Sequence, residues 1–118
     1  MQGRLALGRR LKKTRVLFIC SLNRWRSPTA EQIFSEYPGI ETSSAGVSNH
    51  ADNPVTPELI AAADIIFVME KAHKSKLTQS FGAWLHDKRV ICLNIPDKYP
   101  FMDERLIALL KLRVTPFL

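Results

Sequence analysis

One cysteine and one arginine stand in a short segment with the right chemistry to attack an anionic substrate. Five residues separate Cys20 from Arg26, and no Asp or Glu occurs from 20 to 30. A cysteine thiolate is a strong nucleophile. Arginine offers planar, bidentate donors to phosphoryl oxygens and stabilises negative charge that builds up on them in a transition state. The pair therefore indicates nucleophilic attack on a phosphorylated group.

Two polar residues of the same segment fit this chemistry. Ser27 can hydrogen-bond the sulfur and help it leave in a second step, and Asn23 tolerates the left-handed backbone of a tight anion-binding loop. The alternative is an inert cysteine at the end of a buried strand, a common state of free cysteines. Catalysis is favoured because the segment runs from a buried strand to a helix start, where N–H groups and the helix dipole attract anions.

A nucleophile of this kind needs an acid to protonate the leaving oxygen, and Asp97 is the candidate. It follows the apolar run 90–93, at the edge of the sheet where the loop is expected. Beside Pro96, an aspartate also commonly serves a turn or a helix cap. Asp103 is the alternative acid, but it suits the N-cap of the last helix.

Strands and helices alternate along the chain. Strands are predicted at 16–20, 40–44, 65–69 and 90–93, and helices at 27–37, 56–62, 70–80 and 103–114. This order predicts a three-layer α/β/α fold with a four-stranded parallel sheet, formed by βαβ crossovers. Such sheets bind ligands beyond the carboxyl ends of their strands, so a phosphate-binding loop is expected directly after the first strand.

The segment from Val16 to Glu31 resembles the signature region of the low-molecular-weight protein tyrosine phosphatases. Three shorter segments resemble later family motifs in the family's order, and the resemblance spans most of 14–113. These are Ser44-Ala45-Gly46, Ile65 to Lys71, and Ile95 to Tyr99. The resemblance implies a phosphatase that works through a phosphocysteine intermediate, needs no metal or other cofactor, and takes its general acid from the last of these motifs.

The sequence departs from the family pattern, which places it in a shortened, divergent branch. Leu22 stands where the family usually has glycine, Trp25 where it has a second cysteine, and Lys98 where proline follows the acid. The chain also lacks a segment before Ile65 that usually contributes a histidine to the site, and His50 is not assigned that role. Because Trp25 stands in place of the second cysteine, the disulfide that the family forms between its neighbouring cysteines is not possible here.

The resemblance and the chemistry together define a candidate site and its substrate class. The predicted catalytic residues are Cys20, Arg26 and Asp97, and the predicted substrate-binding residues are Ser21, Leu22, Asn23, Arg24, Trp25, Ser27 and Tyr99. The expected substrate is a phosphorylated protein or a small aryl or alkyl phosphate. Arg24 and Trp25 suit a cationic, aromatic rim, although Trp25 could instead pack against the last helix. Tyr99 could stack on an aromatic leaving group or pack within its loop.

Three other functions compete with this hypothesis. The departures at Leu22, Trp25 and Lys98 leave open an inactive module that binds phosphate or a phosphorylated partner. Arsenate reductases with a similar loop need further cysteines, and the second cysteine here, Cys92, lies inside an apolar strand where an unreactive thiol is expected. Nucleic-acid binding depends on charge alone and is not favoured.

The net charge of +6 is confined to one end of the 118-residue chain. Residues 1–15 hold six basic and no acidic residues, and 11 of each sign remain in 16–118. We therefore divide the chain into a basic arm, 1–15, and a single phosphatase-like domain, 16–118. No apolar run is long enough to span a membrane, and 5–7 is too short for a secretory signal, so a cytoplasmic protein is expected. His73, among lysines, is expected on a solvated helix face. The sequence does not specify an oligomeric state.

Overall fold

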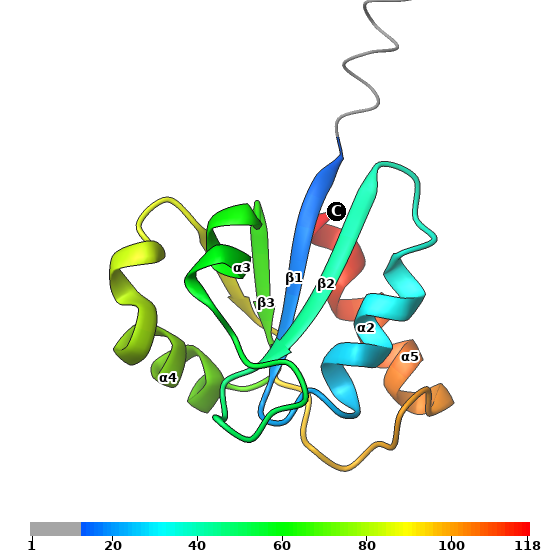
Figure 1. Ribbon diagram of the computed structural model, residues 1–118. Coiled ribbons are helices and arrows are strands. Elements are labelled where there is room, and N and C mark those ends of the chain that lie inside the picture. The colour runs from blue at the N-terminus through cyan, green and yellow to red at the C-terminus, as the bar shows by residue number, and fades with distance from the viewer. Residues whose placement is uncertain (1–12) are drawn as a thin grey trace, which may run out of the picture.

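A four-stranded parallel sheet forms the centre of the protein, whose computed structural model describes residues 13–118 (Figure 1). Its strands are β1 (Thr14–Cys20), β2 (Ile40–Gly46), β3 (Ile65–Val68) and β4 (Arg89–Cys92). They lie in the order β2-β1-β3-β4, and every neighbouring pair is parallel. The strand order reverses between β1 and β3, and in sheets of this kind the crevice at such a point is where ligands bind.

Helices cover both faces of the sheet, which confirms the predicted three-layer fold. They are α2 (Arg26–Phe34), α3 (Pro57–Ala62), α4 (Lys71–Phe81) and α5 (Glu104–Val114), with short 3-10 turns at Gly82–Trp84 and Thr115–Phe117. In Figure 1, α2 and α5 lie on one side of the sheet, and α3 and α4 on the other. None of the helices in the described part of the chain is long and apolar enough to cross a membrane.

Alternation of side chains along β1 creates two separate cores. Phe18 points to the α2–α5 side, where its ring stacks on Phe34 at 5.6 Å and on Phe67 at 5.5 Å between centroids. Leu17 and Ile19 point to the other core, beneath α3 and α4. Because both faces of β1 are buried, the strand is fixed, and so is the start of the loop that follows it.

Local sequence signals set the helix starts. The Thr56 hydroxyl accepts a hydrogen bond from the Leu59 N–H at 3.2 Å, and Asp103 Oδ1 accepts one from the Arg105 N–H at 2.8 Å. Asp103 therefore caps α5, as its position predicts.

The bounds of three elements differ from those predicted by two residues or more. β1 begins at Thr14, so Thr14 and Arg15 pair with β2 instead of belonging to the arm, and residues 1–12 of that arm lie outside the described residues. β2 continues to Gly46, and α2 begins at Arg26 and ends at Phe34. Parallel pairing with β1 extends β2 beyond its apolar residues, which periodicity alone does not detect.

Candidate active site

The loop between β1 and α2 is fixed by hydrogen bonds that its carbonyl groups accept from the segment after β2. The carbonyls of Cys20, Ser21 and Leu22 accept hydrogen bonds from the N–H groups of 47, 48 and 52, at 2.9, 3.1 and 3.0 Å. Within the described residues, no backbone N–H from 21 to 26 donates to another protein group. Unpaired N–H groups at the start of a helix form an anion-binding site, so the loop is built to receive an oxyanion.

Asn23 holds the loop together from within. Its φ of 59° is left-handed, as predicted for this position, and its side chain is only 7% exposed. Asn23 Nδ2 donates to Ser27 Oγ and to Ser44 Oγ, both at 2.9 Å. Ser27 Oγ in turn lies 3.0 Å from Cys20 Sγ, the contact expected for the serine that stabilises the sulfur.

Gly46, at the end of β2, allows the loop to pack closely. A Cβ at this position would lie 2.6 Å from the Ala51 side chain and closer still to the Ser21 carbonyl oxygen. The backbone of 46 also bonds to 53 and 55, so it cannot move aside freely. Glycine is therefore required here by close approach of the loop.

Arg26 is almost completely buried, with 2% exposure, and its guanidinium is fixed at several points. Arg26 Nη1 donates to the carboxylate of Glu70 and, at 2.7 Å, to the Ile95 carbonyl. Its Nε lies 3.6 Å from Asp97 Oδ1. A buried charge needs this degree of pairing, and the pairing also aims the planar donors. Glu70 was not among the residues predicted for the site.

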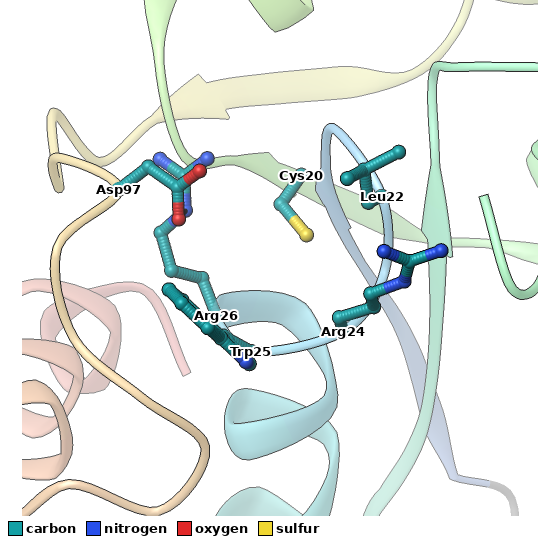
Figure 2. Close-up of a pocket in the computed structure, with 6 residues that line it drawn as sticks. All are labelled: Cys20, Leu22, Arg24, Trp25, Arg26 and Asp97. Atoms are coloured by element: carbon teal, nitrogen blue, oxygen red, sulfur yellow. Dashed lines mark ion pairs between the residues drawn. The ribbon is translucent and has the colours of Figure 1, made fainter. Parts of the chain in front are cut away.

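A cavity of about 230 Å³ opens over the loop and brings the predicted catalytic residues together (Figure 2). It is lined by Cys20, Leu22, Arg24, Trp25, Arg26 and Asp97. In Figure 2 the sulfur of Cys20 lies between the Arg26–Asp97 pair on one side and Leu22 and Arg24 on the other. Thus a thiol, a guanidinium and a carboxyl group face one space large enough for a phosphoryl group.

The opening of the cavity is exposed, in contrast to its base. Trp25 is 46% exposed and lines the opening, so it does not bury against the last helix. Arg24 forms an ion pair across the loop, with its Nε 3.4 Å from Asp52 Oδ1, and both side chains are well exposed. The opening therefore carries one exposed aromatic and one exposed cationic side chain.

Tyr99 lies apart from the residues that line the cavity. It is buried in the core beneath α2 and α5, and Arg105 lies over its ring at 5.4 Å. Because Tyr99 follows Asp97 closely, it is expected at the cavity opening, but its ring packs inward with the core cluster. Ser21 also lies outside the lining, since its hydroxyl points to α4.

His73 is buried, at 3% exposure, so its predicted solvated position is wrong. Its Nε2 lies 2.9 Å from Ser21 Oγ, and its Nδ1 accepts the Glu70 N–H at 3.0 Å. Burial lowers the pKa of His73 to about 4, and the nearby charge of Arg26 contributes in the same direction, against the opposing effect of Glu70 and Asp97. The ring is therefore neutral near pH 7. A polar residue three places before a histidine at a helix start is a capping-box spacing that could have revealed it.

The polar groups of the site are a thiol, an arginine, a carboxyl group and backbone N–H donors. Across 13–118, no group of three or more His, Cys, Asp or Glu side chains is arranged to hold a metal ion.

Comparisons with known proteins give matches to phosphatases. The sequence profile described as "Low molecular weight phosphotyrosine protein phosphatase" matches residues 15–63. A protein-arginine-phosphatase of Bacillus subtilis is 29% identical in an alignment of length 96, which covers 58% of this chain and 64% of that protein. The low molecular weight protein-tyrosine-phosphatase Etp of Escherichia coli K12 is 28% identical in an alignment of length 123, which covers 75% of this chain and 80% of Etp.

A solved structure shows the same fold. Vibrio vulnificus Wzb, in complex with benzylphosphonate, superposes with a TM-score of 0.72 at 22% identity, covering 89% of this chain and 97% of that one. The parallel sheet, with a loop that begins at Cys20 directly after β1, is the α/β fold that this chain shares with Wzb. The matched profile and the Escherichia coli relative both carry the name of low molecular weight phosphotyrosine or tyrosine phosphatases, and this chain is similar to them.

Proposed function

We propose that this protein is a phosphomonoester hydrolase in which Cys20 is the nucleophile, Arg26 binds the phosphoryl oxygens and Asp97 is the general acid. The observation that carries the proposal is the shared cavity: Cys20, Arg26 and Asp97 line one space, above a loop whose N–H groups point to no protein acceptor within 13–118. A dianionic phosphate placed there meets backbone and guanidinium donors at once. These donors bind the extra charge of the transition state better than that of the substrate.

The first step transfers the phosphoryl group to sulfur. The Cys20 thiolate attacks phosphorus, the S–P bond forms, and the bond from phosphorus to the leaving oxygen breaks. Asp97, in its protonated form, donates a proton to that oxygen, so an alcohol or phenol leaves instead of its anion. Its carboxyl group lies across the cavity opening from the loop and near Arg26, which suits this role.

The second step reverses these roles. The Asp97 carboxylate takes a proton from water, whose oxygen attacks phosphorus, and the S–P bond breaks to give inorganic phosphate and the Cys20 thiolate. Ser27 donates a hydrogen bond to the departing sulfur from 3.0 Å. Asn23 Nδ2 donates to Ser27 Oγ, and the serine hydrogen has two acceptors within reach, the sulfur at 3.0 Å and the Ala45 carbonyl at 3.4 Å.

The proposed substrate is a phosphorylated protein, and phosphotyrosine is the side chain that fits the rim best. Trp25 and Leu22 give the opening apolar walls that can contact a phenyl ring, and Arg24 adds a positive charge. An aromatic ring beside Trp25 contributes packing energy that a small alkyl phosphate lacks. The loop residues Ser21, Leu22, Asn23, Arg24, Trp25 and Ser27 then form the substrate site, and Tyr99 supports it from the core.

Arsenate reduction is not proposed because the second cysteine is badly placed. Cys92 lies on the edge strand β4, where it pairs in register with Val68 of β3. It packs with the α3–α4 core, whereas Cys20 belongs to the opposite core. A resolving thiol must reach the first sulfur through a mixed intermediate.

A single nucleophilic thiol is stable only where reductants maintain it, so we place the enzyme in the cytoplasm.

Hydrolysis of a generic aryl phosphate tests the mechanism. The wild-type protein should turn over, Cys20→Ser should lose all but background activity, and Asp97→Asn should fall by about 10²–10⁴-fold in kcat. His86→Asn, an exposed loop histidine, is the matched control. Undiminished turnover in Cys20→Ser would exclude the mechanism. A wild-type protein that binds vanadate without turnover would be the binding module instead.

A further inference from the structure

The start of α4 contacts the residues at both ends of the Cys20–Arg26 loop. We propose that Glu70 and His73 act as one clamp, in which His73 positions Ser21, next to the nucleophile, while Glu70 positions Arg26. The inference rests on the proposed function of the loop, since it assigns two positioning residues to that site. Neither residue lines the cavity, so each acts through the side chain that it holds.

The hydrogen bonds of His73 define which nitrogen carries the proton. The Glu70 backbone N–H can only donate, so His73 Nδ1 accepts it at 3.0 Å and must be unprotonated. A neutral ring then carries its hydrogen on Nε2, which donates to Ser21 Oγ at 2.9 Å. The ring is a fixed link: one nitrogen is bound to the start of α4, and the other is bound to the loop.

Glu70 forms the other arm of the clamp. Its backbone carbonyl accepts the His73 N–H at 3.0 Å, and its carboxylate pairs with Arg26 Nη1. The preceding residue, Met69, is held in turn because its N–H donates to the Ile19 carbonyl in β1 at 3.0 Å. The clamp therefore stands on the central sheet, which is the rigid part of the fold.

This arrangement explains how a shortened chain can keep its loop in register. The outer carbonyls of the loop are bound by the segment after β2, but the Ser21 side chain and the Arg26 guanidinium are bound from the other side, by α4. An oxyanion site works only if its donors are already aimed before the substrate arrives. Loosening the clamp should therefore weaken phosphate binding and slow turnover together.

Two substitutions at His73 separate the two halves of the ring. In His73→Asn the side-chain oxygen can replace Nδ1 and keep the helix cap, but nothing reaches Ser21. In His73→Gln the amide nitrogen can replace Nε2 and reach Ser21, but the cap is lost. We expect the Asn variant to bind inorganic phosphate about tenfold more weakly while it unfolds near the wild-type urea midpoint. The Gln variant should retain more phosphate affinity than the Asn variant.

Ser21→Ala provides a second, independent measurement. It should match the loss in His73→Asn, and the double variant should be no worse than either alone, because both remove one hydrogen bond. The readouts are inorganic phosphate affinity by calorimetry, the pH profile of Cys20 alkylation by iodoacetamide, and the ¹⁵N shifts of the imidazole that report its tautomer. His50→Asn and His86→Asn, both exposed, are the controls.

The outcomes separate the clamp from the catalytic proposal. Wild-type phosphate affinity and an unchanged alkylation profile in both His73→Asn and Ser21→Ala would overturn the clamp, as would losses that add in the double variant. If the wild-type protein binds phosphate without hydrolysing an aryl phosphate, and His73→Asn weakens that binding, the clamp stands and the proposed hydrolase activity fails.

Discussion

The base and the rim of the cavity belong to the same loop, yet they are built differently. The base consists of Cys20, Asn23, Arg26 and Ser27, all buried and joined by hydrogen bonds to one another or to neighbouring elements. The rim consists of Leu22, Arg24 and Trp25, all exposed, with one solvent-exposed ion pair to Asp52. The two sets are interspersed along the loop, so inward residues are fixed by the fold and outward residues are not.

This difference separates reaction from recognition. A buried side chain with several partners cannot change without leaving other groups unpaired, and each such loss has a full desolvation cost. An exposed ion pair such as Arg24–Asp52 contributes little to stability. The base should therefore tolerate almost no substitution, whereas the rim can vary with the substrate.

Arg26→Lys should give the largest effect and tests whether the base is as rigid as the contacts indicate. Lysine lacks the planar fork and cannot serve Glu70, the Ile95 carbonyl and a phosphoryl group at once. We expect kcat/KM for an aryl phosphate to fall by about 10³-fold. Arg24→Lys, the same exchange on the rim, should fall by less than about tenfold. Equal losses in the two variants would contradict the division between base and rim.

The next prediction concerns the support beneath the base. The pKa of His73 is about 4 in the folded protein and 6.5 for an unperturbed histidine, because burial and Arg26 disfavour the charged ring while Glu70 and Asp97 oppose them. The unfolded chain therefore binds more protons between these values. Stability from this group is complete above pH 6.5 and is lost as the pH falls towards 4, by up to about 3 kcal/mol.

Urea unfolding at pH 7 and at pH 4.5 measures that change. His73→Asn should show a smaller difference between the two pH values than the wild-type protein, and His86→Asn should show the wild-type difference. If the wild-type and His73→Asn proteins lose the same stability on acidification, the neutral buried ring is not the cause.

Gly46→Ala tests the close approach of the base to β2. The added methyl would overlap the Ser21 carbonyl and the Ala51 side chain, and the loop must move to relieve this. Displacement of a catalytic group by about 1 Å costs up to about 10²-fold in rate, so a loss of that order in kcat/KM is expected. Gly82→Ala is the control, because an added methyl there would meet nothing within 4 Å and the φ of −51° is helical. Unchanged activity in Gly46→Ala would show that the loop is not held at this point.

The sequence was sufficient for local features of the fold and the site. Val16–Cys20 is apolar on both faces, which predicts a central parallel strand, and Asn23 in the loop predicts its left-handed backbone. The position of Asp97 after an apolar strand placed it at the correct edge of the sheet, and the structure brings it within 3.6 Å of Arg26. These inferences depend only on neighbouring residues and on strand order.

The missed residues depend on contacts distant in sequence. His73 lies among lysines, so its surroundings in the chain indicate a solvated helix, but the start of α4 faces the loop, and His73 lies 52 positions after Ser21 in the sequence. Glu70 meets Arg26 across 44 residues. Tyr99, in contrast, was predicted in the site but lies in the core. An aromatic residue close to Asp97 has the same sequence pattern whether its ring faces the cavity or the core. Only tertiary packing distinguishes these cases.

Trp25→Ala should have the smallest effect, and it tests the rim alone. The indole is half exposed, and within 13–118 no hydrogen bond joins its side chain to the base, so its removal should leave Cys20 and Arg26 in place. KM for a tyrosine-phosphorylated peptide should rise by about three- to tenfold, the value of one aromatic contact, while inhibition by inorganic phosphate stays within about twofold. Phosphate reaches only the base, whereas the phenyl ring reaches the rim, so the two measurements report the two regions separately. Equal weakening of peptide and phosphate binding would place Trp25 in the base and remove the basis for a preference for aromatic substrates.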